Sequence, residues 1–280
     1  MCNNYIQALM SKIDKNAWEI VKISRNPKRP ILQDYLNSIF HDFVELHGDR
    51  YYADDPALIG GFARIADTKV MLIGHNKGKN TIENIERNFG MAKPEGYRKA
   101  LRLMRLAERF NLPVVSIIDT PGAFPGIEAE ERGQAESIAR NITEMAKIEV
   151  PIVCVVVGEG GSGGALGIGV GDRILMLSQA IYSVISPEGC ASILWRDASF
   201  APDAAEALNL TAKALYNLGV IDEIIEEPSD GAHTNHHATT NAVKLAIINN
   251  LNSLKNIPVD ELLNLRYKKY SGMGKYLDES

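Results

Sequence analysis

Two mainly apolar runs divide the middle of the chain, at residues 112–118, where Ser116 is the one polar residue, and 151–157. Both are rich in β-branched residues, and a nearly continuous apolar run of this length is typical of a strand buried on both faces of a parallel sheet. The amphipathic stretch 128–146 lies between them and opens with acidic residues, which favour a helix N-terminus. Strand and helix patterns alternate as far as residue 225, so the sequence predicts an α/β fold.

The flanking segments extend this alternation in both directions. Residues 5–24 place apolar side chains among polar ones and predict an amphipathic helical arm. The segment after Pro258 is charged and ends in a glycine-containing stretch, which we interpret as a loose tail. Strands are expected at 58–65, 69–74, 173–177, 180–185 and 219–225, and helices at 33–46, 94–110, 201–218 (broken near Asn209) and 241–254.

These elements suggest three parts without an internal repeat. An N-terminal helical arm covers 1–30, one main domain covers 31–270, and a loose C-terminal tail covers 271–280. A chain of 280 residues is long enough to bury a full core.

Composition excludes several classes of function. The net charge of −5 argues against a general nucleic-acid binder, which needs a basic surface. No apolar run reaches the roughly 18–20 residues of a membrane span, and the first residues lack the apolar core of a signal peptide. The three cysteines, Cys2, Cys154 and Cys190, are scattered, which indicates a reducing compartment and no zinc site. We therefore expect a cytoplasmic protein without a membrane anchor.

The most informative stretch follows the run 151–157, where glycine occupies positions 158, 160, 161, 163 and 164. Glycine at this density allows another group to approach the backbone closely. We expect a loop that leads through Ala165 into a short helix. The unpaired N–H groups of a helix N-terminus favour negative charge, so the pattern predicts main-chain amides that stabilise an oxyanion.

Two nucleotide-binding motifs compete for the same glycines. Gly158, Gly160 and Gly163 match the spacing of the dinucleotide fingerprint, but that motif also needs a carboxylate about 20 residues later. Residues 177–183 contain none. A phosphate-binding P-loop requires Lys followed by Ser or Thr after the glycines, and neither pair is present there.

A third alternative is the nucleophile elbow of a serine hydrolase. Residues 160–164 fit its GxSxG pattern with Ser162 at the centre, after a strand and before a helix. Asp222 and one of three histidines, His233, His236 or His237, follow in the required order. The histidines crowd a polar segment that reads as a solvated surface, and five glycines exceed what an elbow needs.

Two further features have both a structural and a functional interpretation. Residues 119–126 contain two prolines and two glycines at the carboxyl end of a predicted strand, where open α/β folds bind ligands. This loop and residues 158–165 could form two walls of one cleft. Arginines 98, 102, 105 and 109 share one face of the predicted helix 94–110. That stripe is either a solvated surface or a contact for an anionic ligand or partner.

Seven motifs in fixed order make the family recognisable. They are residues 28–30 (KRP), 43–50 (FVELHGDR), 88–102 (NFGMAKPEGYRKALR), 119–126 (DTPGAFPG), 130–134 (EERGQ), 158–165 (GEGGSGGA) and 186–191 (SPEGCA). With these motifs the chain resembles the alpha subunit of the bacterial acetyl-coenzyme A carboxylase carboxyltransferase over roughly residues 16–270. The resemblance implies a crotonase-like fold, a superhelix of ββα units.

The resemblance also implies a reaction and its partners. Carboxybiotin, held on a separate biotin carboxyl carrier protein, gives its carboxyl group to acetyl-CoA to form malonyl-CoA for fatty-acid synthesis. A zinc-ribbon beta subunit supplies most of the acetyl-CoA site in an α2β2 assembly, and biotin carboxylase completes the larger complex. Biotin is not attached to this chain, and no metal site is expected in it.

Site residues follow from the same resemblance. Gly163 and Gly164 would donate N–H groups to the ureido oxygen of biotin as the carboxyl group leaves. The freed biotin nitrogen would then take a proton from the acetyl methyl group, so no side-chain base is needed. Residues expected to contact substrate are Gly122, Ala123, Gly160, Gly161, Ala165 and Arg98. The main rival is a non-catalytic crotonase-like scaffold that only binds an acyl-CoA or another subunit.

Overall fold

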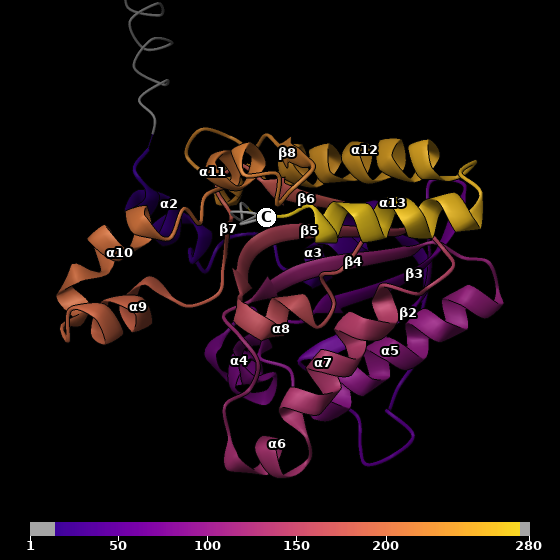
Figure 1. Ribbon diagram of the computed structural model, residues 1–280, viewed down its shortest axis with the longest axis horizontal. Helices are drawn as coiled ribbons and strands as arrows, with labels where there is room; N and C mark the ends of the chain where they lie inside the picture. The colour runs from indigo at the N-terminus through magenta and orange to yellow at the C-terminus, as the bar shows by residue number, and fades with distance from the viewer. Residues whose placement is uncertain (1–14, 275–280) are drawn as a thin grey trace, which may run out of the picture.

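One mixed sheet forms the centre of the computed structural model, which describes residues 15–274 (Figure 1). Among these residues the strand order is β1-β2-β3-β4-β5-β6-β8, and β7 pairs with the carboxyl end of β5. The first three strands are antiparallel and all later pairings are parallel. The strands are β1 (His41–Glu45), β2 (Leu58–Ile65), β3 (Thr68–His75), β4 (Val114–Thr120), β5 (Ile152–Gly161), β6 (Arg173–Leu177), β7 (Ile181–Ser183) and β8 (Glu223–Ile225).

The two apolar runs form the adjacent central strands β4 and β5, as the pattern predicted. Every residue of β4 is buried, and so are the first seven of β5. Their parallel register places Val115 beside Val153 and Ile117 beside Val155. Because both faces of these strands are covered, no polar alternation was available to mark them in the sequence.

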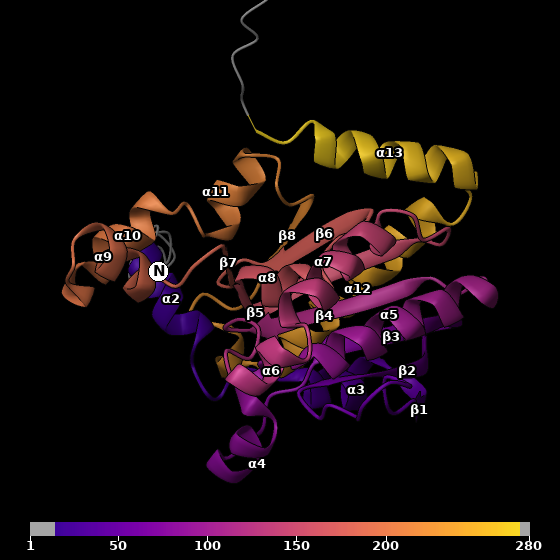
Figure 2. The same cartoon turned by 60° about the horizontal axis from the view of Figure 1, so that its bottom comes forward.

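Helices cover both faces of the sheet (Figures 1 and 2). A Cβ at Gly60 of β2 would meet Leu103 of α5, whereas one at Gly74 of β3 would meet Leu32 of α3 on the opposite face. Within the described residues no helix is both long and apolar enough to cross a membrane. The α-helices are α2 (Ala17–Ser24), α3 (Leu32–Ile39), α4 (Thr81–Glu86), α5 (Pro94–Arg109), α6 (Ile127–Glu131), α7 (Gln134–Met145), α8 (Ser162–Leu166), α9 (Pro187–Leu194), α10 (Ala201–Ala207), α11 (Ala212–Asn217), α12 (His236–Leu254) and α13 (Val259–Ser271), and the 3-10 turns are η1 (Asn88–Gly90), η2 (Ala198–Phe200) and η3 (Ala232–Thr234).

A small lobe of α2, α9 and α10 projects from one end of the sheet (Figure 1). Val21 of α2 packs with Ala205 of α10 in a separate small core, and the Ala17 N–H donates to the Glu206 carboxylate at 2.7 Å. The predicted arm therefore packs against residues almost two hundred positions later. Its residues 5–14 lie outside the described residues, and the proposed division at residue 30 remains a prediction.

Three predicted helices differ from the structure. The helix expected at 33–46 ends at Ile39, and residues 41–45 form β1, because Val44 pairs with Phe62 at the edge of the sheet. The helix expected at 128–146 divides into α6 and α7 at Gly133, whose φ of 81° is left-handed. The last predicted helix begins at His236 instead of 241, with Asn235 accepting from Ala238 as its N-cap.

The charged segment after Pro258 contains a helix that was not predicted from the sequence. Residues 259–271 form α13, which buries Arg266 completely. The Arg266 guanidinium pairs with Asp172 at 2.8 Å and donates to the carbonyls of Met145, Ile148 and Val150. The charged Arg266 side chain can be buried because each of its N–H donors has an acceptor. These acceptors are distant in the sequence, so the sequence pattern does not show them.

We expect Arg266→Met to lower the free energy of unfolding by about 3–5 kcal/mol, because it leaves the buried Asp172 carboxylate without its cation. Urea unfolding measures this change. Lys268→Met, on an exposed position of the same helix, is the matched control and is expected to stay within about 0.5 kcal/mol of the wild type. Equal effects of the two substitutions would contradict this role for Arg266.

Candidate active site

The glycine-rich stretch is mostly strand, which corrects the predicted loop. β5 continues through Gly161 and pairs there with β7, with Gly160 beside Tyr182 and Gly161 beside Ser183. The chain then turns at Ser162, whose φ of 50° is left-handed, directly into α8. The expected short helix is confirmed, whereas the glycines before it extend the sheet.

The loop that follows β4 is in direct contact with the end of β5 and the first turn of α8. A Cβ at Gly161 would overlap the Pro121 carbonyl, and one at Gly164 would overlap the backbone of Gly122 and Ala123. Thr120 fixes the loop after β4, since its hydroxyl donates to the Gly122 carbonyl at 2.7 Å. Four of the predicted site residues therefore meet at one place, and the close approach of two backbones explains glycine at positions 161 and 164.

Gly163 and Gly164 occupy the first turn of α8. The first N–H groups of a helix have no intrahelical acceptor, and Gly161 at the N-cap offers no side chain to bind them. Neighbouring groups hold the turn in place: the Tyr97 hydroxyl donates to the Gly164 carbonyl at 3.3 Å, and Asn141 donates to the Gly167 carbonyl at 2.9 Å. The partly exposed Gly163 is thus held on a rigid support, whereas Gly164 is buried behind it.

An apolar cavity of about 410 Å³ opens beside this turn. Gly163 belongs to its wall, so the cavity and the first turn of α8 form one site. The lining comes from segments far apart in the sequence, including the C-terminal helix, and no local motif predicted it. The lining residues are Ser162, Gly163, Leu166, Gly169, Ile174, Tyr182, Ser183, Val184, Leu208, Leu215, Val220, Tyr270 and Met273.

Paired charges lie behind the two glycine-bearing loops. Lys77 contacts Asp119 at 2.7 Å and Glu159 at 3.4 Å, and Arg25 contacts Glu159 at 2.8 Å. Burial lowers the pKa of Lys77, but the two carboxylates outweigh that effect, and the pKa lies above its ordinary value. This charged network connects the ends of β3, β4 and β5 with the residue that caps α2.

One buried histidine lies next to the candidate oxyanion turn. His75 ends β3 and is completely buried against the Gly164 backbone, near Lys77. Burial lowers its pKa to about 3, and the Lys77 ammonium acts in the same direction. His75 is therefore neutral at physiological pH and adds no charge to the site.

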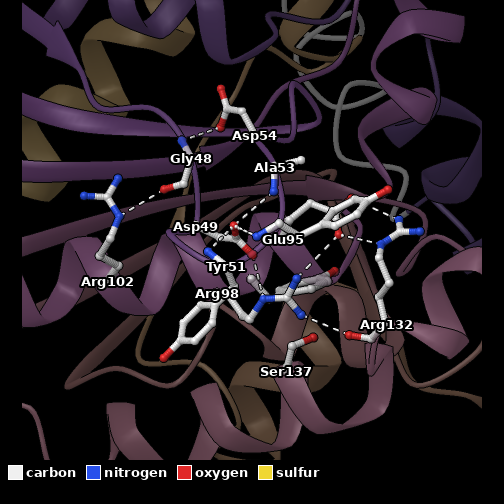
Figure 3. A network of polar contacts seen from close by, with 12 residues as sticks. Gly48, Asp49, Tyr51, Ala53, Asp54, Glu95, Arg98, Arg102, Arg132 and Ser137 are labelled. Atoms are coloured by element: carbon white, nitrogen blue, oxygen red, sulfur yellow. Dashed lines mark hydrogen bonds and ion pairs between the residues drawn. The ribbon is translucent and has the colours of Figure 1, made fainter.

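Arg98 lies in a separate polar network (Figure 3). Its guanidinium contacts Asp49 at 2.7 Å and donates to the Arg132 carbonyl at 3.0 Å, while Arg132 contacts Glu95. The other Asp49 oxygen accepts three N–H groups of the loop that follows it. The structure thus gives Arg98 a role in holding that loop, and its contact with substrate remains a prediction.

Residues of the competing motifs make contacts that those motifs do not require. Asp222 accepts from the Ile174 N–H at 2.6 Å and pairs with Lys269, and His236 contacts the Lys28 carbonyl at 2.7 Å. Asp222 and one of the three candidate histidines, His236, are thereby engaged elsewhere. The structure also lacks the turn of a dinucleotide-binding motif at these glycines, because Gly158 and Gly160 lie within a strand and not in a strand-to-helix turn. Among the described residues no group of three or more His, Cys, Asp or Glu side chains could hold a metal ion.

Solved structures identify the class of the fold. The chain is similar to transcarboxylase 12S with a TM-score of 0.63 and 18% identity, covering 92% of this chain and 44% of that one. It is similar to a Pseudomonas malonate decarboxylase hetero-tetramer with a TM-score of 0.61 and 18% identity, over 78% of this chain and 88% of that one. The chain thus spans less than half of the transcarboxylase chain. The fold is crotonase-like, as the resemblance implied.

Sequence comparison identifies the family. A family model described as acetyl co-enzyme A carboxylase carboxyltransferase-like matches residues 2–274. The acetyl-coenzyme A carboxylase carboxyl transferase subunit alpha of Methylococcus capsulatus is 60% identical over 93% of this chain and 81% of its own length. That of Hydrogenovibrio crunogenus is 58% identical over 92% of this chain and 81% of its own length. The chain belongs to the family of acetyl-CoA carboxylase carboxyltransferase alpha subunits, and the expected transferase class is confirmed.

The contacts of Gly163 and Gly164 predict that alanine substitution changes the free energy of unfolding differently at these two positions. Gly164→Ala should lower the free energy of unfolding by about 1–3 kcal/mol, because its methyl group would press into the backbone of residues 122–123. Gly163→Ala should stay within about 0.5 kcal/mol of the wild type, since the nearest atom to its methyl would be Ile138 at 3.7 Å. Urea unfolding of both variants tests the contact, and indistinguishable losses would refute it.

His75 predicts a pH dependence of stability. Its pKa is about 3 in the folded state against 6.5 ordinarily, so between these values the unfolded chain binds more protons. Its contribution to stability is complete above about pH 6.5 and is lost toward pH 3, by up to about 1.4 kcal/mol per pH unit. His75→Leu should flatten the curve of unfolding free energy against pH, whereas His237→Leu at an exposed position should not. Parallel curves for wild type and His75→Leu would count against this assignment.

Proposed function

We propose that this chain supplies the carboxybiotin half of the active site in the carboxyl transfer that forms malonyl-CoA from acetyl-CoA. Family membership supports the reaction class. The observation that carries the proposal is that Gly163 belongs both to the first turn of α8 and to the wall of the apolar cavity. A polar acceptor can thus be bound at the edge of an apolar enclosure.

The cavity fits the biotin head group in size and in chemistry. About 410 Å³ falls in the range of small-molecule sites, and its walls are mainly aliphatic and aromatic side chains. The fused rings of biotin are compact and largely apolar, apart from the ureido group. Carboxybiotin supplies the carboxyl group for transfer, and negative charge develops on its ureido oxygen as the carboxyl group leaves.

The residues of this chain stabilise that charge through the main chain. We assign the N–H groups of Gly163 and Gly164 as donors to the ureido oxygen, aided by the positive end of α8. Gly161 and Gly164 allow Gly122 and Ala123 to pack against the turn, which fixes the direction of the amides. Gly160 holds β7 in register, and the buried Ala165 anchors the turn in the core. The apolar walls exclude water that would weaken these hydrogen bonds.

A serine nucleophile and a binding-only scaffold are the alternative functions. The engagement of Asp222, the one acid proposed for a triad, by the Ile174 N–H and by Lys269 disfavours the nucleophile. A scaffold would not need a turn whose first amides are uncapped beside an apolar cavity. We therefore favour a catalytic role that uses backbone donors and no side-chain base.

Partners complete the proposed reaction. We infer a zinc-ribbon beta subunit in an α2β2 assembly, a biotin carboxyl carrier protein that delivers carboxybiotin, and biotin carboxylase that recharges it, all in the cytoplasm. Exposed apolar side chains on the projecting lobe support contact with another subunit: Ile193 and Leu194 are 70% and 64% exposed at the end of α9. An apolar patch of this kind is typical of a protein interface.

Removal of one N–H group tests the proposal without removing a side chain. In a Ser162→Gly background, which tolerates the left-handed turn before proline, Gly163→Pro deletes an amide that the helix itself does not use. We expect kcat for malonyl-CoA formation, measured with the beta subunit and carboxylated carrier, to fall by about 10²–10³. Gly163→Ala in the same background keeps the amide and should retain most activity.

The same series separates the alternatives. Ser162→Gly alone removes the hydroxyl, so a loss of roughly 10⁴-fold or more in that variant would indicate a serine nucleophile. Equal activity of the Gly163→Pro and Gly163→Ala variants, with unchanged melting temperatures, would show that the Gly163 amide is not a donor in the reaction. Absence of turnover in an intact wild-type complex would favour the scaffold.

A further inference from the structure

A second and larger cavity, of about 770 Å³, lies along α5 and shares no lining residue with the apolar cavity. Its wall is unusually rich in cations. We call it the arginine groove, defined by six arginines of α5, α7 and the loop after β1: Arg50, Arg98, Arg102, Arg105, Arg109 and Arg140. The four α5 members are the stripe seen in the sequence, and the other two come from elsewhere in the chain.

The acidic side chains do not balance these cations. Asp49 is used by Arg98 and by three backbone N–H groups, and Glu136 and Glu144 pair with Arg140 and Arg105. Among residues 15–274, no acidic side chain lies within 4.0 Å of the three remaining guanidinium groups. These three are Arg50, Arg102 and Arg109. Asp54 and Asp49 act on Arg102 only through space, so the groove lining of six arginines and two acids keeps an excess of positive charge.

Two of these cations are held close together by one backbone oxygen. The His47 carbonyl accepts from Arg50 at 2.7 Å and from Arg102 at 3.2 Å. Arg102 also donates to the Gly48 carbonyl at 3.0 Å, as Figure 3 shows. Like charges at this separation repel, and carbonyl dipoles offset the repulsion only in part. Burial and then the neighbouring Arg50 charge lower the pKa of Arg102. An anion bound between the two guanidinium groups would relieve the repulsion.

We propose that the arginine groove is a binding site for a nucleotide that carries two or more phosphates. Planar guanidinium groups pair with phosphate oxygens through two parallel hydrogen bonds, and several phosphates can engage several arginines at once. Tyr51 also lines the groove and is 84% exposed, which provides an aromatic face for a base. A concave site of this volume fits a small ligand better than the flat face of a protein partner.

The groove and the candidate active site lie on two sides of one helix. Glu136 and Arg140 of α7 face the groove, while Ile138 of the same helix lies beside Gly163 and Asn141 holds the Gly167 carbonyl. Two sources carry the proposed ligand chemistry: the phosphorylated adenosine end of coenzyme A, or a free nucleotide. The inference goes beyond the proposed oxyanion role and does not depend on it, because it concerns different residues and is tested by binding.

Calorimetric titration of the full chain with inorganic tripolyphosphate tests the site without turnover. We expect binding that weakens as salt rises, and a loss of affinity of about tenfold in Arg50→Gln and in Arg102→Gln, as each removes one charge-assisted contact. Arg102→Lys should recover part of the affinity lost in Arg102→Gln, because lysine restores the positive charge but not the paired planar donors of a guanidinium group. Arg64→Gln, which removes the same charge from β2 outside the groove, should bind like the wild type.

Several outcomes would overturn the proposal. These are no tripolyphosphate binding by the wild type, an equal loss in Arg64→Gln, or binding of polyglutamate without binding of tripolyphosphate, which would indicate an acidic protein partner instead. Displacement of tripolyphosphate by coenzyme A but not by ADP would assign the groove to the substrate's nucleotide. Displacement by ADP at a concentration similar to that of coenzyme A would assign the groove to a free nucleotide. Either result supports the proposal that the groove binds a nucleotide with two or more phosphates. Melting temperatures of each variant confirm that it is folded.

Discussion

The contact between the loop after β4 and the turn after β5 is the constraint on which the candidate active site depends. Two stretches of backbone meet there without side chains between them, at Gly161 against Pro121 and at Gly164 against residues 122–123. Parallel neighbours end at the same edge of a sheet, so β4 and β5 deliver both stretches to one place. The first turn of α8 cannot shift without breaking this contact. Its amides therefore keep one direction, as an oxyanion site requires.

Paired charges connect this edge of the sheet to the N-terminal part of the chain. Lys77, Asp119 and Glu159 lie behind the two loops, and Arg25 reaches Glu159 from the end of α2. Arg29, also buried, donates to the Val157 carbonyl of β5 at 2.9 Å. Buried charges are costly unless each has a partner, so the network tolerates little displacement of any strand end. The segment after α2 thus helps to fix the position of the glycine turn, although it contributes nothing to the cavity wall.

The two cavities differ in their polar groups: main-chain amides in the apolar cavity and side-chain cations in the arginine groove. The apolar cavity beside Gly163 is suited to a compact ring system, with backbone amides as the polar contact. The arginine groove is suited to phosphates, and within residues 15–274 three of its six guanidinium groups have no carboxylate partner. Helix α7 lies between them, with Ile138 beside Gly163 and Arg140 in the wall of the groove. The two sites therefore share a support while differing in chemistry.

The sequence alone determined the α/β class, the two central strands, most helices, the family and the glycines of the candidate site. Mainly apolar runs and ordered motifs are local signals, which survive without knowledge of the fold. Tertiary structure decided what depends on distant partners: residues 41–45 became a strand because β2 offers an edge, and charged α13 is anchored because Arg266 finds Asp172 and three carbonyls. It also assembled the apolar cavity from Tyr182, Leu215 and Met273. No spacing along the chain could have shown these, because pairing, burial and charge compensation are properties of neighbours in space.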